Sequence, residues 1–316
     1  MFDLSDKVVL VTGGSSGIGK SISEFLSEKG FKVYGTSRNP EKYQEKISFP
    51  LLNMEVTNPS SINEVITKII DEEGRLDIVI NNAGVGITGP IEETPASEIK
   101  KAFDINLHGP INVIKSVLPQ MRKQKSGLII NITSIAGYMG LPYRGIYSAT
   151  KAALEITAEA FRIEIKQFGI EMTNIAPGDF ATKIADGRYH APVISQSPYK
   201  KDYSNTLEIM NSHVSSGKDP KDLAQVLYLI IRSKNPRVRY KEGSMLQKFS
   251  IVLKRILPSR WYEKMLMNHY KLKLNIFVKF FISFRVPHPT KPIVFFMSNC
   301  LYFSIIGFGN YLKVFS

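Results

Sequence analysis

The sequence is short of cysteine, since Cys300 is the only one among its 316 residues. A single cysteine cannot form a disulfide within the chain, so no disulfide framework holds this fold. The amino-terminal residues 1–6 lack the basic region followed by an apolar stretch that marks a secretory signal. These absences predict a protein of the reducing cytoplasm, and we expect no metal site.

Acidic residues are scarce near the end of the chain. Residues 232–316 hold 16 Lys and Arg against 2 Asp and Glu, whereas residues 1–231 hold 25 against 26. The net charge of +13 therefore belongs to the end of the chain. A nucleic-acid binder needs such charge on a folded face, interleaved with base-stacking side chains. We expect no nucleic-acid partner.

The first 180 residues alternate short β-branched runs with longer amphipathic segments. This pattern predicts consecutive βα units around a parallel sheet, with helices covering both faces. The predicted strands are Lys7–Thr12, Phe31–Thr36, Phe49–Met54, Asp77–Asn81, Gly127–Thr133, Ile170–Ala176 and Val238–Tyr240. The predicted helices are Ile18–Lys29, Ser60–Glu73, Ser97–Gln120, Tyr147–Gln167 and Pro220–Arg232. The predicted fold class is α/β: a single doubly wound Rossmann domain with a central parallel sheet over residues 1–245, followed by a basic, apolar C-terminal extension over residues 246–316.

A glycine-rich turn, Thr12–Gly19, follows the first predicted strand and opens the first helix. Glycines allow a close backbone approach to a dinucleotide, and the helix amino terminus favours its pyrophosphate charge. The second strand ends at Ser37 and Arg38, where a carboxylate would instead accept bonds from the ribose diol. Arg38 can pair with a 2′-phosphate, which favours NADP(H) over NAD(H). The alternative is a solvated arginine that starts a loop.

Tyr147 and Lys151 lie four residues apart on a predicted helix, so they project from one face. An ammonium beside a phenol favours phenolate, which makes the tyrosine a usable proton donor and acceptor near neutral pH. Ser134 lies thirteen positions upstream and offers a second hydrogen-bond donor. These groups suit the interconversion of an alcohol and a carbonyl, with hydride from a reduced nicotinamide.

Together these motifs resemble the short-chain dehydrogenase/reductase superfamily over about residues 5–182. The resembling set is Thr12-Gly-x-x-x-Gly-Ile-Gly19, Asn81-Asn82-Ala83-Gly84, Asn106, Ser134, Tyr147-x-x-x-Lys151 and Pro177-Gly178. The resemblance implies that Tyr147 is the general acid/base, that Lys151 lowers its pKa and binds the nicotinamide ribose, and that Ser134 holds the substrate oxygen. It also implies that Asn106 supports a water-linked proton relay to the lysine.

The same resemblance implies a set of cofactor contacts. The expected cofactor-binding residues are Thr12, Gly13, Ser15, Ser16, Gly17, Ile18, Gly19, Ser37, Arg38, Glu55, Val56, Asn82, Ala83, Gly84, Asn106, Tyr147, Lys151, Pro177, Gly178, Phe180 and Thr182. Glu55 departs from the family, which often has Asp after the third strand to hold the adenine amino group. The family commonly forms dimers or tetramers, so a homo-oligomer is expected.

A narrower resemblance concerns the substrate, because residues 82–90 and 139–143 are similar to branches that act on hydroxysteroids, retinol and other apolar alcohols or ketones. The expected substrate contacts are Ser134, Tyr138, Tyr143 and Tyr147. The polar, aromatic segment over residues 182–217 lacks a clear period and is predicted to be an irregular lid region. The alternative is that these side chains only pack the lid.

The C-terminal extension mixes apolar and basic residues, most densely over residues 246–273. Such mixtures lie on anionic membrane surfaces or cover a substrate cleft or partner subunit. Residues 291–313 enclose 21 residues without charge, close to the length that spans a bilayer. A membrane anchor, an interface strap and a poorly ordered extension all remain open for that stretch.

The sequence thus predicts an NADP-dependent oxidoreductase acting on CH–OH groups of a small apolar carbonyl or alcohol substrate. A catalytically silent nucleotide-binding scaffold or sensor, acting at a membrane or on a protein partner, is the alternative. The intact set of four catalytic groups argues against that alternative.

Overall fold

A computed structural model describes residues 6–181 and 187–272 of the chain. Within these ranges a parallel sheet has the strand order β3-β2-β1-β4-β6-β7-β9, as an α/β Rossmann fold requires, and the predicted fold class is confirmed. The strands are β1 (Val8–Val11), β2 (Lys32–Ser37), β3 (Leu51–Asn53), β4 (Ile78–Asn81), β6 (Gly127–Ile132), β7 (Ile170–Pro177) and β9 (Arg239–Glu242). The chain reverses its direction of winding between β1 and β4, where sheets of this kind bind ligands.

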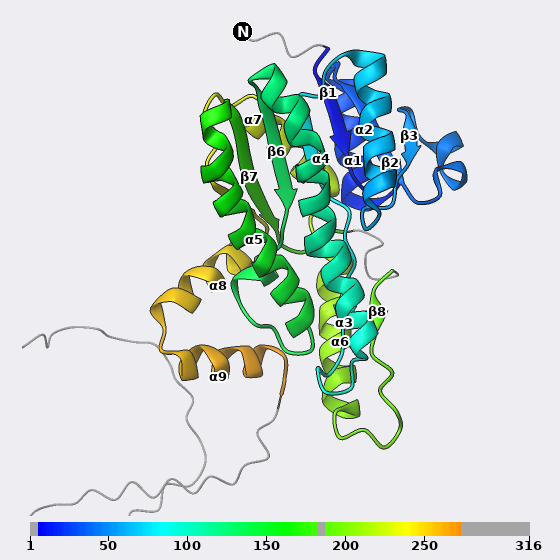
Figure 1. Cartoon of the computed structure of the whole chain (residues 1–316). Coiled ribbons are helices and arrows are strands. Elements are labelled where there is room, and N and C mark those ends of the chain that lie inside the picture. The colour runs from blue at the N-terminus through cyan, green and yellow to red at the C-terminus, as the bar shows by residue number, and fades with distance from the viewer. Residues whose placement is uncertain (1–5, 182–186, 273–316) are drawn as a thin grey trace, which may run out of the picture. The chain divides into compact units, whose positions relative to one another are not determined.

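Helices cover both faces of the sheet, which explains why its central strands β1 and β4 are mainly apolar and fully buried. On one face lie α1 (Gly17–Glu28) and α7 (Pro220–Ile231), and their fully buried side chains include Ile22, Leu26 and Leu227. On the other lie α2 (Pro59–Glu73), α4 (Gly109–Gln124) and α5 (Gly145–Ile165). Figure 1 shows α4 and α5 in front of β6 and β7, with α7 behind them. Short 3₁₀ turns occupy Pro40–Lys42, Gln44–Lys46, Ile135–Tyr138 and Lys166–Phe168.

A row of buried asparagines crosses the middle of the sheet. Asn81, Asn131 and Asn174 are register partners on β4, β6 and β7. The amide of Asn81 donates to Asn131 (2.9 Å), and that of Asn131 donates to Asn174 (3.1 Å). The amide of Asn174 donates in turn to Glu155 on α5 (2.5 Å). Because buried polar groups need partners, this row fixes the register of the three strands and the position of α5.

The predicted helix over Ser97–Gln120 is interrupted, which corrects the expectation of one continuous element. The structure has α3 (Ala96–Phe103), a wider π-helical turn over Asp104–His108, and then α4. The amide of Gly109 bonds to the carbonyl of Asp104, five residues back. Pro110 has no amide hydrogen to give to the carbonyl four residues earlier, so an ordinary turn cannot form here.

The described part of the predicted irregular segment, residues 187–217, is more regular than expected. A two-residue strand, β8 (Tyr189–His190), pairs with β5 (Ile87–Thr88), and a helix, α6, spans Lys200–Ser215. The buried positions of α6 recur at helical spacing, at Tyr203, Thr206, Met210 and Val214. The prediction of an irregular segment is therefore wrong for α6, because two of its four inward positions are polar or amphipathic and hide the period.

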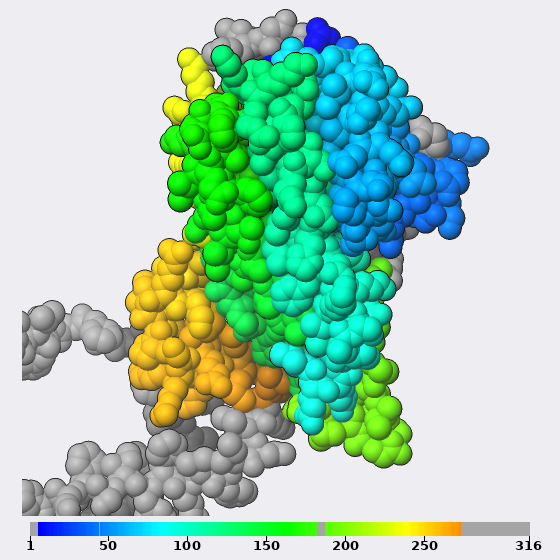
Figure 2. All heavy atoms as spheres, in the orientation of Figure 1, coloured from blue at the N-terminus to red at the C-terminus, as the bar shows by residue number. Residues whose placement is uncertain are grey.

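Part of the C-terminal extension folds onto the carboxyl end of the sheet. Helices α8 (Met245–Ile256) and α9 (Ser259–His269) belong to the compact unit that ends at Lys273. Ile251 and Tyr262 are buried against Ile135 and Met139, and the Tyr262 hydroxyl lies 2.8 Å from the Met139 sulfur. In Figure 2 the orange surface of α8 and α9 adjoins the green surface of α5. The predicted boundary at residue 245 stays a prediction.

No helix in residues 6–181 and 187–272 is long and apolar enough to cross a membrane. The uncharged stretch over residues 291–313 lies outside the described residues, and its three interpretations stay predictions.

Candidate active site

The glycine turn after β1 has the shape that a dinucleotide needs. Gly13 and Gly17 have φ values of 67° and 53°, which favour glycine. At Gly19 an added Cβ would meet the carbonyl oxygen of Gly13, so this helix start tolerates no side chain. Ser16, the N-cap of α1, makes no capping bond through its side chain. The first amides of α1 and the hydroxyls of Ser15 and Ser16 are thus suited to an anion such as a pyrophosphate.

The turn after β4 is tied directly to this glycine turn. The hydroxyl of Thr12 accepts from the amides of Asn82 (3.0 Å) and Ala83 (2.9 Å). The side-chain amide of Asn82 donates to the carbonyl of Thr12 (2.9 Å). The two turns at the switch point therefore form one rigid rim, and the residues predicted from the sequence lie together there.

Asn106 and Lys151 meet beside Gly84. The side chain of Asn106, fully buried in the π-helical turn, accepts from the amide of Val85 (2.8 Å) and donates to the hydroxyl of Thr150 (3.1 Å). A Cβ on Gly84 would lie 3.1 Å from Asn106 Oδ1 and 3.5 Å from Lys151 Nζ. Asn106 thus joins the turn after β4 to the helix that carries Lys151.

Lys151 is buried, and its ammonium donates to the carbonyl of Ile132 (2.9 Å). Burial lowers the pKa of Lys151, while the neighbouring Tyr147 phenol acts in the opposite direction. An ammonium has three donors, so two remain for hydroxyl groups of a ligand or for water.

Ser134 begins the 3₁₀ turn after β6, and its hydroxyl oxygen accepts from the amide of Ala136 (3.1 Å). Because the oxygen is used as an acceptor, the hydroxyl hydrogen can point to another oxygen. Tyr147 lies in the first turn of α5 and is partly exposed, and it is one turn away from Lys151. The predicted proton donor, second donor and ammonium therefore come from α5 and the adjoining loop.

Ser37, Arg38 and Glu55, the residues predicted to lie beside the adenosine, lie at or just after the ends of β2 and β3. Arg38 is exposed, and its Nε lies 3.8 Å from a carboxylate oxygen of Glu55. The hydroxyl of Ser37 accepts from the amide of Asn39 (3.2 Å). Val56 is buried under Gly109, where an added Cβ would lie 2.8 Å from Val56 Cγ2. The chain thus offers both a cation and an anion at the end of β2 and β3.

The remaining predicted cofactor residues follow β7. The amide of Gly178 donates to the carbonyl of Glu242 (2.6 Å), so Pro177 and Gly178 are fixed against β9. Phe180 is buried in the core beneath them. Thr182 lies outside the described residues, and its contact stays a prediction.

The predicted substrate residues differ in their surroundings. The Tyr138 hydroxyl donates to Glu155 (2.8 Å), and burial together with the Glu155 charge raises the pKa of Tyr138. Tyr143 adopts a φ of 56°, and its ring centroid lies 5.4 Å from that of Tyr203 on α6. The Tyr203 hydroxyl in turn lies 3.1 Å from that of Thr88. Tyr143 therefore faces the described part of the lid region, whereas Tyr138 is engaged by α5.

Two arginines near Tyr147 were not predicted from the sequence. Arg144 lies three residues before Tyr147, with its guanidinium carbon 5.5 Å from the centre of the Tyr147 ring. Arg188 adjoins β8 and packs against Gly86. Arg144 could have been predicted from its place three residues before Tyr147, at the start of the same helix. The position of Arg188 depends on the pairing of β8 with β5, which the sequence does not show.

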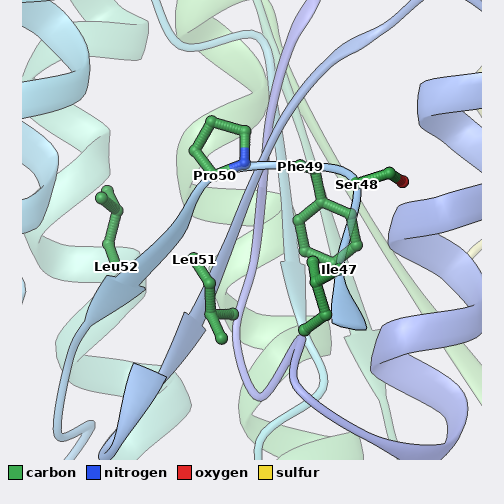
Figure 3. Close-up of a pocket in the computed structure, with 6 residues that line it drawn as sticks. All are labelled: Ile47, Ser48, Phe49, Pro50, Leu51 and Leu52. Carbon is green, nitrogen blue, oxygen red and sulfur yellow. The ribbon is translucent and has the colours of Figure 1, made fainter. Parts of the chain in front are cut away.

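A surface hollow lined by Ile47–Leu52 lies at the start of β3, the outer strand of the sheet (Figure 3). Leu51 and Leu52 point to opposite sides in this view, as neighbours on a strand do. Its lining has no titratable side chain, so it offers none of the chemistry that gathers around Tyr147.

Comparisons with known proteins agree with this geometry. The family model described as short chain dehydrogenase matches residues 7–192. A 3-ketodihydrosphingosine reductase from Bacteroides thetaiotaomicron is 38% identical over 271 residues, covering 85% of this chain and 100% of that protein.

Two solved structures are similar as well. A short-chain dehydrogenase from Streptomyces avermitilis is 28% identical with a TM-score of 0.71, covering 85% of this chain and 97% of that one. ElxO with NADP bound is 29% identical with a TM-score of 0.59, covering 75% and 96%. This chain belongs to the short-chain dehydrogenase/reductase family and is a nucleotide-binding oxidoreductase.

Proposed function

We propose that this protein uses NADP(H) to interconvert a carbonyl and a secondary alcohol on an apolar substrate. The observation that carries the proposal is the arrangement of Ser134, Tyr147 and Lys151 beside the glycine turn. A free hydroxyl hydrogen, a phenol and a buried ammonium lie on α5 and its adjoining loop, at the edge where the sheet binds ligands. These are the groups that carbonyl reduction needs.

The residues around the glycine turn fit a dinucleotide, because Gly19 lets the turn pack tightly against Gly13 and the start of α1 has no side-chain cap. The amino terminus of α1 would hold the pyrophosphate, and Lys151 would hold the nicotinamide ribose. The bound nicotinamide supplies the hydride, which no side chain can provide. Every other step of the proposed reaction rests on the protein's own groups.

Tyr147 is proposed as the proton donor for the developing alkoxide, and as the acceptor in the reverse direction. Ser134 donates a hydrogen bond to the same substrate oxygen, which stabilises the charge that forms there. Lys151 favours the ionised phenol after proton release, and Asn106 fixes the turn against which Lys151 lies. The water-linked relay through Asn106 stays part of this proposal.

The preference for NADP(H) rests on Arg38. Its ion pair with Glu55 is exposed and 3.8 Å long, and such pairs contribute about 0–1 kcal/mol. A 2′-phosphate offers a bidentate, doubly charged partner, so it would compete successfully for the guanidinium. The NADP bound by ElxO is consistent with this preference.

The substrate class is supported by the relative from Bacteroides thetaiotaomicron, whose name states that it reduces 3-ketodihydrosphingosine. That substrate is a long-chain ketone. Here the apolar side chains of Ile135, Met139 and Tyr262 form a cluster beside Ser134. We therefore infer a long-chain ketone as the substrate of this protein.

Helix α8 carries the proposed membrane contact. Met245, Phe249, Val252 and Ile256 follow one another at helical spacing and are 43–86% exposed. The opposite side of α8 is buried through Ile251. The neighbouring exposed basic residues are Lys254, Arg255, Arg260 and Lys264. An apolar stripe flanked by cations suits the surface of an anionic bilayer, from which a lipid substrate could enter.

A homo-oligomer is proposed through α5. Ile156 and Ile163 lie two turns apart on its outer side and are 66% and 77% exposed. Large apolar side chains repeated on one face of a long helix suit a self-complementary helix contact.

The experiment that tests the proposal is NADPH oxidation with long-chain 3-ketones. We expect turnover with NADPH to exceed turnover with NADH by about tenfold to a hundredfold, the range of a charge-assisted hydrogen bond. Arg38→Ala should remove the preference, whereas Lys42→Ala, which removes a nearby exposed cation, should keep it. Equal use of both cofactors by the unmodified protein would refute the role of Arg38.

A further inference from the structure

Arg188 is a buried cation at the edge of the active site. It is 9% exposed, and its side chain packs against Gly86, two residues beyond the Gly84 that adjoins Lys151. Its guanidinium donates to the amide oxygen of Asn211 on α6 (3.3 Å). A neutral amide is a weak partner for a buried charge, so most of the cost of burying Arg188 is not met by this bond.

Arg144 approaches the same region from α5. Its guanidinium carbon lies 5.5 Å from the centre of the Tyr147 ring, and it is the N-cap of the helix that carries Tyr147. Burial lowers the pKa of Arg188, and the charge of Arg144 lowers it further. The charges of Arg144 and Arg188 therefore act on each other, and Arg144 lies against the Tyr147 ring.

No carboxylate within residues 6–181 and 187–272 lies at ion-pair distance from Arg144 or Arg188. Among the described residues, the carboxylate whose charge acts on Arg188 is that of Asp179, which also accepts from the side-chain amide of Gln247 (2.5 Å). Proteins rarely keep two buried or half-buried cations together without an anion, because their charges cost free energy. An anionic group of a ligand placed between the two arginines would meet both charges.

We propose that Arg144 and Arg188 form a subsite for an anionic group of the substrate, a carboxylate or a phosphate monoester, close to the carbonyl that is reduced. The inference rests on the proposed function, because it places the group beside Tyr147. Guanidinium groups bind both anions through paired, charge-assisted hydrogen bonds. A protonated amine at the same place would be repelled by both arginines.

The subsite would change the choice among long-chain ketones. The ketone 3-ketodihydrosphingosine carries an amine near its carbonyl, whereas a 3-oxo acid or a ketone phosphate carries an anion there. Chain length alone would not separate these compounds, since all of them present the same apolar tail. The charge beside the carbonyl would separate them.

The test compares kcat/KM with NADPH for four ketones of equal chain length: a 3-oxo carboxylate, its phosphate counterpart, a neutral methyl ketone and 3-ketodihydrosphingosine. We expect one or both anionic ketones to be used about tenfold to a hundredfold better than the neutral one, the range of a charge-assisted hydrogen bond. Better use of the carboxylate or of the phosphate identifies the source of the anion. Equal or better use of the neutral or cationic ketone would overturn the proposal.

Variants separate a direct contact from a general loss of fold. Arg188→Gln should remove the preference for the anionic ketone over the neutral ketone, and Arg188→Lys should restore part of that preference. Arg122→Gln, which removes a cation from the far end of α4, is the matched control. An equal loss with neutral and anionic ketones in Arg188→Gln would overturn the proposal.

A binding measurement keeps the inference separate from the proposed activity. Calorimetric titration with dodecanoate and dodecanol, in the presence of NADP, should show tighter binding of the carboxylate, and this difference should vanish in Arg188→Gln. If no ketone is reduced but the difference in binding is found, the proposed function fails and the subsite stands. If ketones are reduced but dodecanoate binds no better than dodecanol, the subsite fails and the proposed function stands.

Discussion

Glu155 joins helix α5 to the loop that carries Ser134. Its carboxylate accepts from the hydroxyls of Thr133 (3.0 Å) and Tyr138 (2.8 Å), which flank Ser134 on both sides. It also accepts from the amide of Asn174 (2.5 Å), the end of the asparagine row across the sheet. At the scale of single residues, the position of Ser134 therefore depends on Glu155, a buried side chain bonded only to other protein groups among the described residues.

Glu155→Gln tests this dependence. In the unmodified protein, three donors bond to the two carboxylate oxygens of Glu155. A glutamine would keep one acceptor oxygen and replace the other with an NH2 group, which is a donor. We expect a loss of about 1–3 kcal/mol in the free energy of unfolding, with a lower kcat and an unchanged affinity for NADPH. Urea unfolding and fluorescence titration measure these quantities.

The matched control is Glu159→Gln, because Glu159 lies one turn further along α5 and pairs with Arg239, which also lies near Glu155. Its side chain is 36% exposed, so the change should cost less than about 1 kcal/mol. Equal stability of the unmodified protein and Glu155→Gln would contradict the account.

At the scale of elements, Asp77 ties the start of β4 to the start of β1. Its carboxylate accepts from the ammonium of Lys7 (2.9 Å), the amide of Val8 (3.0 Å) and the guanidinium of Arg75 (2.5 Å). Burial of Asp77 acts to raise its pKa, but the bonds from Arg75, Lys7 and Val8 outweigh it and lower the pKa below the ordinary value. The ionised carboxylate therefore stabilises the folded state.

The pH dependence follows from the direction of that shift. The contribution of Asp77 is fully present above its unfolded pKa of about 4, and it is lost as the pH falls through the lower pKa of the folded state. We expect Asp77→Asn to lower the free energy of unfolding by about 1–3 kcal/mol at pH 7, with a smaller difference below pH ~4. Urea unfolding at a series of pH values checks this, and a difference that does not change with pH would contradict it.

The central elements could be predicted from the sequence because their physical signals are local. The central strands β1 and β4 are buried on both faces, so they appear as apolar runs, and Tyr147 and Lys151 are four residues apart on one helix. The π-helical turn could not be predicted by a helical period, because it follows from Pro110 and a single bond to Asp104.

The contacts near the substrate depend on tertiary structure, which local periods do not report. Helix α6 was missed because its inward side includes Thr206 and Tyr203 in place of aliphatic residues. Arg188 reaches the site only because β8 pairs with β5, a contact between segments about a hundred residues apart. Sequence motifs thus predict the proposed reacting groups, whereas the groups proposed to select the substrate are found only in the structure.

At the scale of the whole molecule, positive charge and exposed apolar area lie together on the C-terminal extension. The catalytic part of the chain is nearly neutral, since residues 1–231 hold 25 basic and 26 acidic side chains. The exposed stripe of α8 therefore adjoins the most basic part of the sequence, while the buried side of the same helix packs near Ser134. This arrangement would place the active site close to the surface that the extension binds.

Phe249→Ser combined with Ile256→Ser tests the membrane contact. These side chains are 54% and 71% exposed, so their loss should leave the fold intact and reduce binding to vesicles that contain anionic lipid by about tenfold or more. Leu229→Ser, an exposed change of the same kind on α7, is the control. Co-sedimentation that does not differ between the double variant and the control would contradict the proposed contact.

The most direct test of the central claim is turnover by Tyr147→Phe, measured beside its affinity for NADPH. The change removes one hydroxyl from a partly exposed side chain, and Tyr199→Phe makes the same change at another partly exposed position, whose hydroxyl donates to Glu92. We predict that kcat falls by about a hundredfold to ten-thousandfold in Tyr147→Phe, while NADPH binds as before and Tyr199→Phe keeps full activity. Unchanged turnover in Tyr147→Phe would contradict the assignment of this protein as a reductase that uses Tyr147 as its proton donor.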